Sequence, residues 1–279
     1  MIPLVIFHSN CLDGFGSAYS AYVHFEINHQ QQVEFLPASH SDEPPDVTGR
    51  TVYLLDYVYK RRFMEQVCSQ AEKVVVLDHH ITAVTDLAGL DTQYANLDLN
   101  LDMDRSGAMM AWEYFHEQPA PKLIACVQDR DLWRWEIPES LDLNTGLMSH
   151  SFSFQAWHEW ANNDQAFQRL VDEGNAINRF RRQMIEQNKR AAVMGTIAGF
   201  NVPIVNCPRA IVSELVGELA EGQPFAAGYM DLANRRSWSL RSTEGGEDVA
   251  KIAELFGGGG HQRAAGFATE LTDHPPILK

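Results

Sequence analysis

Three short runs of apolar, largely β-branched residues lie in the first third of the chain, and each ends at residues that can bind a metal ion. The runs and the residues that follow them are 4–7 with His8, 51–55 with Asp56, and 74–77 with Asp78, His79 and His80. Continuous apolar runs of this length are typical of parallel strands buried on both faces. Because open sheets of this kind bind ligands beyond the carboxyl ends of their strands, we expect these polar residues to share one edge.

Helical patterns separate the apolar runs. They cover residues 14–25 and 60–71, and a third helix is expected to start near Ser106. Alternation of strands and helices predicts an α/β fold in which an N-terminal open parallel sheet is flanked by helices, with right-handed crossovers. We assign this N-terminal domain to residues 1–154.

The second half of the chain changes pattern. Residues 155–194 are charged and helical in periodicity and contain no proline, which predicts a helical linker. Residues 195–279 predict a smaller C-terminal α/β domain, with a loose end at 272–279. Its expected strands are 196–200, 202–206, 225–230 and 237–241, and its expected helices are 212–220 and 248–256.

The net charge of the chain argues against binding to long duplex DNA. The 279 residues contain 22 Lys and Arg against 37 Asp and Glu, which gives a formal net charge of −15. A protein that binds long duplex DNA usually carries the opposite charge, so we expect a small anionic substrate held by a local cation cluster. The four cysteines are too far apart for a zinc knuckle or a disulfide framework. No apolar stretch predicts a membrane segment, so we expect a cytoplasmic protein, and the sequence leaves open whether it forms a homodimer.

Imidazoles and carboxylates at the predicted strand ends form a candidate metal site. The alternatives, residue by residue, are a solvated turn at 78–80, a structural histidine at His8, a helix cap at Asp56 and a salt-bridged turn at 129–131. Together, a mixed set of histidine and carboxylate ligands suits manganese better than a structural zinc. The candidate ligands are His8, Asp13, Asp56, His79 and Asp129.

Two manganese ions in this site would hold a phosphoryl group and activate water. One carboxylate must then bridge the two ions, and Asp56 is the candidate. Since clustered carboxylates repel one another until cations bind, we expect the stability of the protein to depend on metal.

A glycine-rich segment, GGGGHQRAAGF at residues 257–267, is the second strong signal. Four glycines after a predicted helix indicate a loop whose amides can approach an anion, and the alternative is a flexible linker. The candidate substrate contacts are Gly258, Gly259, Gly260, His261, Arg263 and Arg241.

The motifs HSNCLDGFGSA, the Asp56 strand end, LDHHIT, DRDLW and GGGGHQRAAGF occur in the order typical of the DHH phosphoesterase family. The chain resembles the branch of this family that carries a DHH-associated C-terminal domain, and the resemblance covers nearly its whole length. It implies a two-manganese phosphoesterase. The implied roles are His8 and Asp56 on one ion, Asp13, Asp56, His79 and Asp129 on the other, Asp78 as an orienting residue, and His80 near the scissile phosphate.

The first motif departs from the family pattern. Many relatives have two aspartates there, whereas this chain has Asp13 alone, with Leu12 where the earlier one is expected. The ion at His8 would then be held more weakly, or be completed by Asn10, Asp131 or water.

The leading hypothesis is a manganese-dependent phosphodiesterase that hydrolyses short oligonucleotides and linear dinucleotides to mononucleotides, with cyclic dinucleotides as further candidate substrates. One alternative is a phosphatase for 3′-phosphoadenosine 5′-phosphate. The other is a nucleotide-binding sensor with weak catalysis, which the missing second aspartate favours. An exonuclease for long strands fits poorly because the acidic chain shows no basic channel.

Overall fold

A computed structural model describes residues 1–39 and 42–271 of the chain. The chain divides into two compact units, and the division falls between Asn178 and Arg179. The segment 272–279, expected as a loose end, lies outside the described residues. Within the described ranges, no helix combines the length and the apolar character needed to cross a bilayer.

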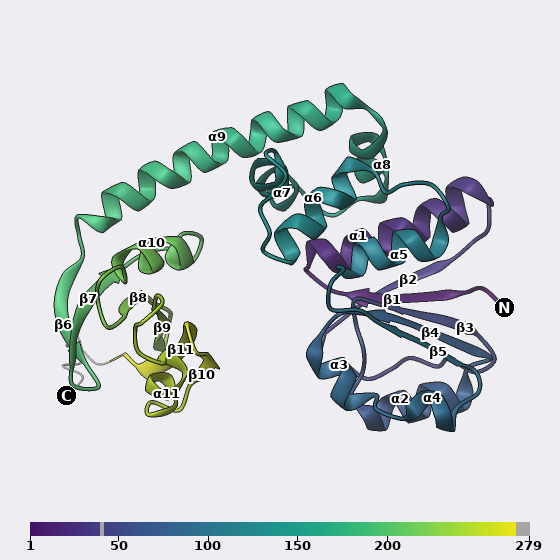
Figure 1. Cartoon of the computed structure of the whole chain (residues 1–279), viewed down its shortest axis with the longest axis horizontal. Coiled ribbons are helices and arrows are strands. Elements are labelled where there is room, and N and C mark those ends of the chain that lie inside the picture. Colours follow the sequence, from purple (N-terminus) through teal and green to yellow (C-terminus); the bar gives the residue numbers. More distant parts are fainter. Residues whose placement is uncertain (40–41, 272–279) are drawn as a thin grey trace. The chain divides into compact units, whose positions relative to one another are not determined.

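The first unit is built on a five-stranded parallel sheet with the strand order β2-β1-β3-β4-β5 (Figure 1). Its strands are β1 (Leu4–His8), β2 (Glu34–Ala38), β3 (Thr51–Leu55), β4 (Lys73–Asp78) and β5 (Leu97–Leu101). The predicted α/β fold and its three buried strands are confirmed, while the sequence analysis did not find β2 and β5. Phe7 pairs with Leu55 and Leu55 pairs with Leu77, so β1, β3 and β4 end at the same level.

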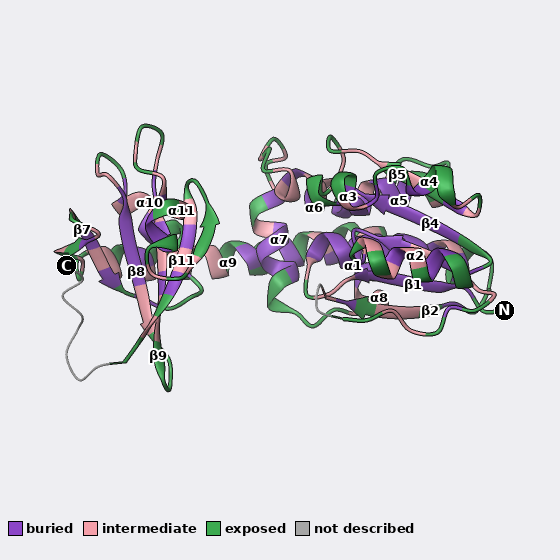
Figure 2. Cartoon of the chain, turned by 90° about the horizontal axis from the view of Figure 1, so that it is seen from below, coloured by how far each residue is buried: buried purple, intermediate pink, exposed green. Residues whose placement is uncertain are grey.

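Helices cover both faces of this sheet. They are α1 (Leu12–Tyr22), the π-helix η1 (Val23–Asn28), α2 (Arg61–Gln70), α3 (Ile81–Asp86), α4 (Leu90–Gln93), α5 (Gly107–Phe115), α6 (Lys122–Asp131), α7 (Ser140–Ser149) and α8 (Phe154–Asn162). Alternate side chains of β1 point to opposite faces: Val5 packs in the cluster that includes α1 and α5, and Leu4 in the cluster that includes α2. Figure 2 shows β1 and β4 buried for most of their length.

The long helix α9 (Asp164–Lys189) contains the division between the units, so the expected linker 155–194 is shared by both. The second unit has a six-stranded mixed sheet with the order β10-β11-β9-β8-β7-β6. Its elements are β6 (Val193–Ile197), β7 (Phe200–Asn206), α10 (Val212–Leu219), β8 (Ala226–Asp231), β9 (Arg235–Arg241), α11 (Val249–Glu254), β10 (Gly259–His261) and β11 (Ala264–Glu270).

Two local predictions in the second unit are wrong. The expected strand 196–200 contains a hairpin turn, where Ala198 and Gly199 have φ of 48° and 84°. The expected glycine loop is largely a β-hairpin, because β10 pairs antiparallel with β11 and Gly259 lies opposite Gly266. Small residues on β11 let the glycine-rich strand approach its backbone closely, which a pattern of glycines alone does not reveal.

Candidate functional site

The carboxyl ends of β1 and β3 frame the point where the sheet changes direction. From β1 the chain continues to β2 on one side of β1 and then crosses to β3 on its other side. In such sheets a crevice opens between the two strands at this switch point. His8 is the last residue of β1, and Asp56 directly follows β3. The topology therefore explains why these two residues lie next to each other.

Imidazole and carboxylate groups crowd at this edge. His79 Nε2 lies 3.2 Å from Asp56 Oδ1, 3.5 Å from Asp13 Oδ2 and 3.4 Å from Asp131 Oδ2. On the other side, His8 Nδ1 lies 3.7 Å from Asp56 Oδ2. The structure thus brings together four of the five predicted ligands.

These side chains form three overlapping groups whose ligand atoms lie close enough to bind a metal ion. The groups are His8 with Cys11 and Asp56, Asp56 with His79 and His80, and Asp13 with His79 and Asp131. The first and third groups share no residue, and Asp56 contacts members of both. Its Oδ2 is the atom nearest His8, whereas its Oδ1 faces His79. The two oxygens of the Asp56 carboxylate therefore face two different ligand groups.

The environment of Asp56 fits a bound cation. Asp56 is 2% exposed, and neither carboxylate oxygen has a well-aligned hydrogen-bond donor among the described residues; the groups nearest to these oxygens are the imidazoles of His79 and His8. A buried carboxylate without donors is costly unless a positive charge compensates it. Space is kept for the group by Gly107, where a Cβ would come within 2.5 Å of the Asp56 Cβ.

Asp13 is held rigidly from the opposite side. Its Oδ2 accepts a hydrogen bond from the Gly107 N–H at 2.7 Å, and its Oδ1 accepts one from the Ala108 N–H at 3.0 Å. Both donors belong to the first turn of α5, where unpaired N–H groups favour a carboxylate. The remaining lone pairs of Asp13 can still face a cation.

The ionisation of the cluster is strongly perturbed. Burial, followed by the negative charges of Asp56 and Asp131, raises the pKa of Asp13 well above its ordinary value. Burial lowers the pKa of His79, but Asp56 and Asp13 outweigh this and raise it to about 9. Asp56 is also the main cause that raises the pKa of His8 to about 10. Protons on these groups thus neutralise the negative charge that a bound metal ion would otherwise neutralise.

Asp78 organises the two histidines that follow it. Its Oδ1 accepts hydrogen bonds from the His79 and His80 backbone N–H groups, at 2.7 and 3.0 Å. The same oxygen lies 2.7 Å from His80 Nδ1. This contact places the Nδ1 proton toward Asp78 and leaves Nε2 as the ring atom that can face a ligand.

The carboxylate at the end of α6 that reaches the cluster is Asp131, and the structure does not place Asp129 in any of the three groups. Asp129 is 4% exposed, and its carboxylate accepts hydrogen bonds from the Glu136 and Ile137 N–H groups. It therefore holds the loop that follows α6. The sequence predicts Asp131 only as a completing ligand for the His8 ion, whereas the structure places it with Asp13 and His79.

Cys11 is the residue of the cluster that sequence analysis did not consider as a ligand. It lies in the turn between β1 and α1 and shares a group with His8 and Asp56. The available signal was its position three residues after His8, in the same motif that lacks a second aspartate. A thiol there supplies a third donor beside His8.

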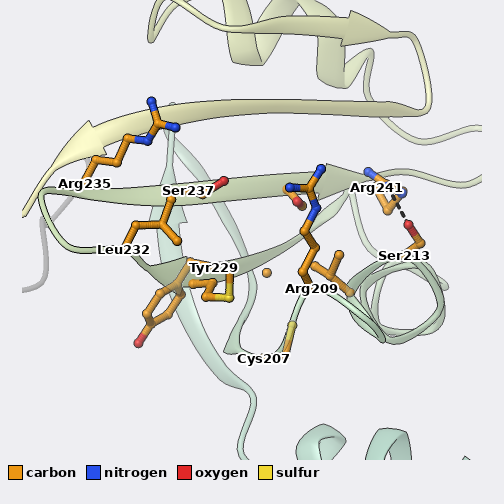
Figure 3. A pocket seen from close by; sticks show the side chains of 12 residues that line it. Cys207, Arg209, Ser213, Tyr229, Leu232, Arg235, Ser237 and Arg241 are labelled. Carbon is orange, nitrogen blue, oxygen red and sulfur yellow. Dashed lines mark hydrogen bonds between the residues drawn. The ribbon is translucent and has the colours of Figure 1, made fainter. Parts of the chain in front are cut away.

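An arginine-rich pocket lies in the second unit, over β8, β9 and the start of α10 (Figure 3). Its volume is about 380 Å³, and no carboxylate of the described residues lines it. Arg209, Arg235 and Arg241 contribute guanidinium groups, and Arg241 Nη2 donates a hydrogen bond to Ser213 Oγ at 2.8 Å. Burial lowers the pKa of Arg241, which indicates a desolvated cation suited to an anionic ligand.

The other predicted substrate contacts lie outside this pocket. His261 and Arg263 are exposed, and neither lines it. A Cβ at Gly258 would come within 2.2 Å of the Gly266 carbonyl oxygen, and one at Gly260 within 2.6 Å of the Ala264 carbonyl oxygen. Backbone packing thus accounts for these two glycines, whereas open space surrounds the position of a Cβ at Gly259.

No family model matches the chain. An uncharacterized protein of Acanthamoeba polyphaga mimivirus is 28% identical over 290 residues, which cover 96% of this chain and 67% of that protein.

Two solved structures share the fold at low sequence identity. One is a DHH domain described as a member of the s1p family of ribosomal proteins, with a TM-score of 0.60, 12% identity, and coverage of 97% of this chain and 83% of that chain. The other is a pGpG-specific phosphodiesterase from Vibrio cholerae, with a TM-score of 0.56, 13% identity, and coverage of 97% and 94%. The chain therefore has the fold of a DHH-domain protein.

Proposed function

We propose that the chain is a DHH phosphoesterase that uses two manganese ions to hydrolyse short oligonucleotides and linear dinucleotides to mononucleotides. The observation that carries the proposal is the Asp56 carboxylate, which is buried between the imidazoles of His8 and His79 and directs its two oxygens to separate ligand groups. Cations bound in these two groups would share the Asp56 carboxylate and would together hold a phosphoryl group.

The residues divide into two ligand sets on this proposal. His8 and Cys11 lie with Asp56 Oδ2, and Asp13, Asp131 and His79 lie near Asp56 Oδ1. Asp131 takes the position that the resemblance gave to Asp129. Divalent cations held here would act as Lewis acids on a phosphoryl oxygen and make a water molecule nucleophilic near neutral pH.

The chain itself positions the reacting groups and moves a proton. Water adds to phosphorus, the bond between phosphorus and the leaving oxygen breaks, and that oxygen must gain a proton. The His80 side chain is 45% exposed beside Asp56, and Asp78 fixes its Nδ1. His80 Nε2 is therefore the atom we assign to contact the phosphoryl group and to protonate the leaving oxygen.

The arginine-rich pocket supports an anionic substrate. Its three guanidinium groups offer charge-assisted hydrogen bonds in a chain whose net charge is −15. An anionic group such as a phosphate is the ligand we assign to this pocket. The same chemistry favours a second candidate function, hydrolysis of 3′-phosphoadenosine 5′-phosphate, which is also a small anion.

The test is a comparison of initial rates with manganese on linear dinucleotides, cyclic dinucleotides, a long oligonucleotide and 3′-phosphoadenosine 5′-phosphate. We expect linear dinucleotides to react fastest. Asp56→Asn should lower the rate about 10³-fold, because it removes the charge of the shared carboxylate.

Asp91→Asn, an exposed aspartate outside the cluster, is the matched control and should keep the wild-type rate. A fully active Asp56→Asn protein would contradict the mechanism. Nucleotide binding without release of mononucleotides by the wild type would favour the sensor alternative.

A further inference from the structure

A second pocket, in the first unit, lies beside the metal-ligand cluster. Its volume is about 630 Å³. The turn between β1 and α1, the end of α6, and the segment after α7 line it. His8 belongs both to this lining and to the ligand group with Cys11 and Asp56, so a ligand in the pocket lies next to the reaction centre.

The pocket differs from the cluster in charge. The cluster holds Asp13, Asp56 and Asp131, whereas the pocket has no carboxylate in its lining within the ranges 1–39 and 42–271. Arg130 is the arginine of the lining, and the imidazoles of His8 and His150 lie beside it, with His150 Nε2 2.7 Å from Glu173. The pocket therefore attracts an anionic part of a substrate, and no carboxylate of the lining repels it.

The N–H donors of the Arg130 side chain are available to a ligand. Its side chain is half-buried, and no described residue forms a hydrogen bond or an ion pair with it. The charge of Asp131 acts on Arg130 from nearby but leaves its N–H groups without an acceptor. A phosphate that accepts two parallel hydrogen bonds satisfies these donors.

Helix geometry explains why Arg130 lines the pocket while Asp131 reaches the metal-ligand cluster. Successive side chains on a helix point about 100° apart, so residues 129, 130 and 131 at the end of α6 face three directions. Asp129 holds the following loop, Asp131 reaches His79, and Arg130 lines the pocket.

The far wall of the pocket is aromatic. Phe152 is 38% exposed and lines it, and its ring stacks on Phe15 with centroids 4.9 Å apart. Packing against Phe15 fixes the plane of the exposed ring, which is the arrangement on which a nucleobase stacks.

We propose that this pocket binds the nucleotide next to the hydrolysed bond, with Arg130 on a second phosphate one nucleoside away from the reacting phosphate and Phe152 under the base. The proposal rests on the proposed function and adds a substrate preference to it. Dinucleotides that carry a terminal phosphate are better substrates than dinucleotides without one.

The experiment compares kcat/KM for pApA and ApA, with manganese, in the wild type, Arg130→Gln, Arg130→Lys and Arg241→Gln. We expect the wild type to prefer pApA by about tenfold or more, the gain expected from a charge-assisted hydrogen-bonded pair. Arg130→Gln should bring the ratio close to one, and Arg130→Lys should restore part of it. Arg169→Gln, which changes an exposed arginine of α9, is the matched control and should keep the wild-type ratio.

If Arg130→Gln keeps the wild-type ratio of kcat/KM for pApA to kcat/KM for ApA, the proposal is overturned. It is also overturned if Arg241→Gln alone loses the preference for pApA, since the terminal phosphate would then bind in the second unit. Calorimetric titration of the metal-free proteins with pApA and ApA gives a readout that needs no catalysis. If the wild type hydrolyses neither compound, the proposed function fails. The pocket assignment then stands if pApA binds more tightly than ApA and Arg130→Gln removes the difference, and it falls if the difference persists or is absent from the wild type.

Discussion

Asp56 adopts a backbone conformation that few residues other than glycine tolerate, with φ of 56°. Aspartate and asparagine enter this left-handed region more readily than most residues, because their short side chains can interact with the local backbone. The turn follows β3 directly, and the Asp56 carboxylate lies within 3.7 Å of imidazoles on both sides. A locally unfavourable conformation at a charged, buried residue is typical of a functional site.

The pH dependence of stability tests the charge balance of the cluster. In the folded protein the pKa of His8 is about 10 and that of His79 about 9, both above the ordinary 6.5. Protonated imidazoles therefore stabilise the metal-free fold fully below pH 6.5, and this stabilisation is lost as the pH rises through 9 to 10. We expect the Tm in chelator to fall over this range.

Manganese should oppose that loss, because it replaces the protons that neutralise the carboxylates. Thermal unfolding with chelator and with excess manganese, from pH 6.5 upward, measures both effects. The difference in Tm should widen as the pH rises. Equal Tm values with and without manganese at every pH would show that these residues do not bind the ion.

At the scale of elements, the end of α6 and its loop depend on Asp129. Its carboxylate accepts the N–H groups of Glu136 and Ile137, and its carbonyl oxygen accepts the N–H of Arg134 at 2.9 Å. Trp133 and Trp135 in this loop have φ of 56° and 57°. Residues in this region need such external support.

Asp129→Ala should therefore lower the free energy of unfolding by about 2 kcal/mol or more, because it leaves two N–H groups without acceptors. Urea denaturation measures this change. Asp129→Asn, which keeps one side-chain oxygen, should lose less. A change below about 0.5 kcal/mol in Asp129→Ala would mean that water replaces the carboxylate without cost.

Sequence patterns predicted the strands that are buried on both faces, since β1, β3 and β4 are continuous apolar runs. They failed for β2 and β5, whose partly exposed residues give no such run. They also could not separate Asp129 from Asp131, because the hydrogen bonds of the following loop decide which carboxylate is free to face His79. The glycines at 258 and 260 reflect contacts with β11, a strand that single-sequence reasoning had not placed beside them.

At the scale of the whole molecule, the chain is acidic, but arginine side chains line two pockets. The net charge is −15, while, in the part of the chain that the structure describes, no carboxylate lines the pocket of Arg130 or the pocket of Arg209, Arg235 and Arg241. Substrates with few phosphates can fill such pockets, whereas a long strand would have to pass over an acidic surface. This distribution favours short substrates.

Salt dependence tests this inference. A protein that contacts six to ten phosphates loses about 10³- to 10⁵-fold in affinity between about 50 and 200 mM salt. We expect kcat/KM on a dinucleotide to fall by less than about tenfold over that range, because only one or two phosphates bind outside the reaction centre. A steep salt dependence together with faster hydrolysis of long strands would contradict the assignment of short substrates.

Manganese stoichiometry tests the central claim most directly. Calorimetric titration, supported by electron paramagnetic resonance, should find two ions per wild-type chain with the magnetic coupling of neighbouring ions about 3.5–4 Å apart. Asp56→Asn should abolish the coupling and at least one of the two binding events. Binding of no ion, or of uncoupled ions that Asp56→Asn leaves unchanged, would contradict a shared metal centre at the carboxyl ends of β1, β3 and β4.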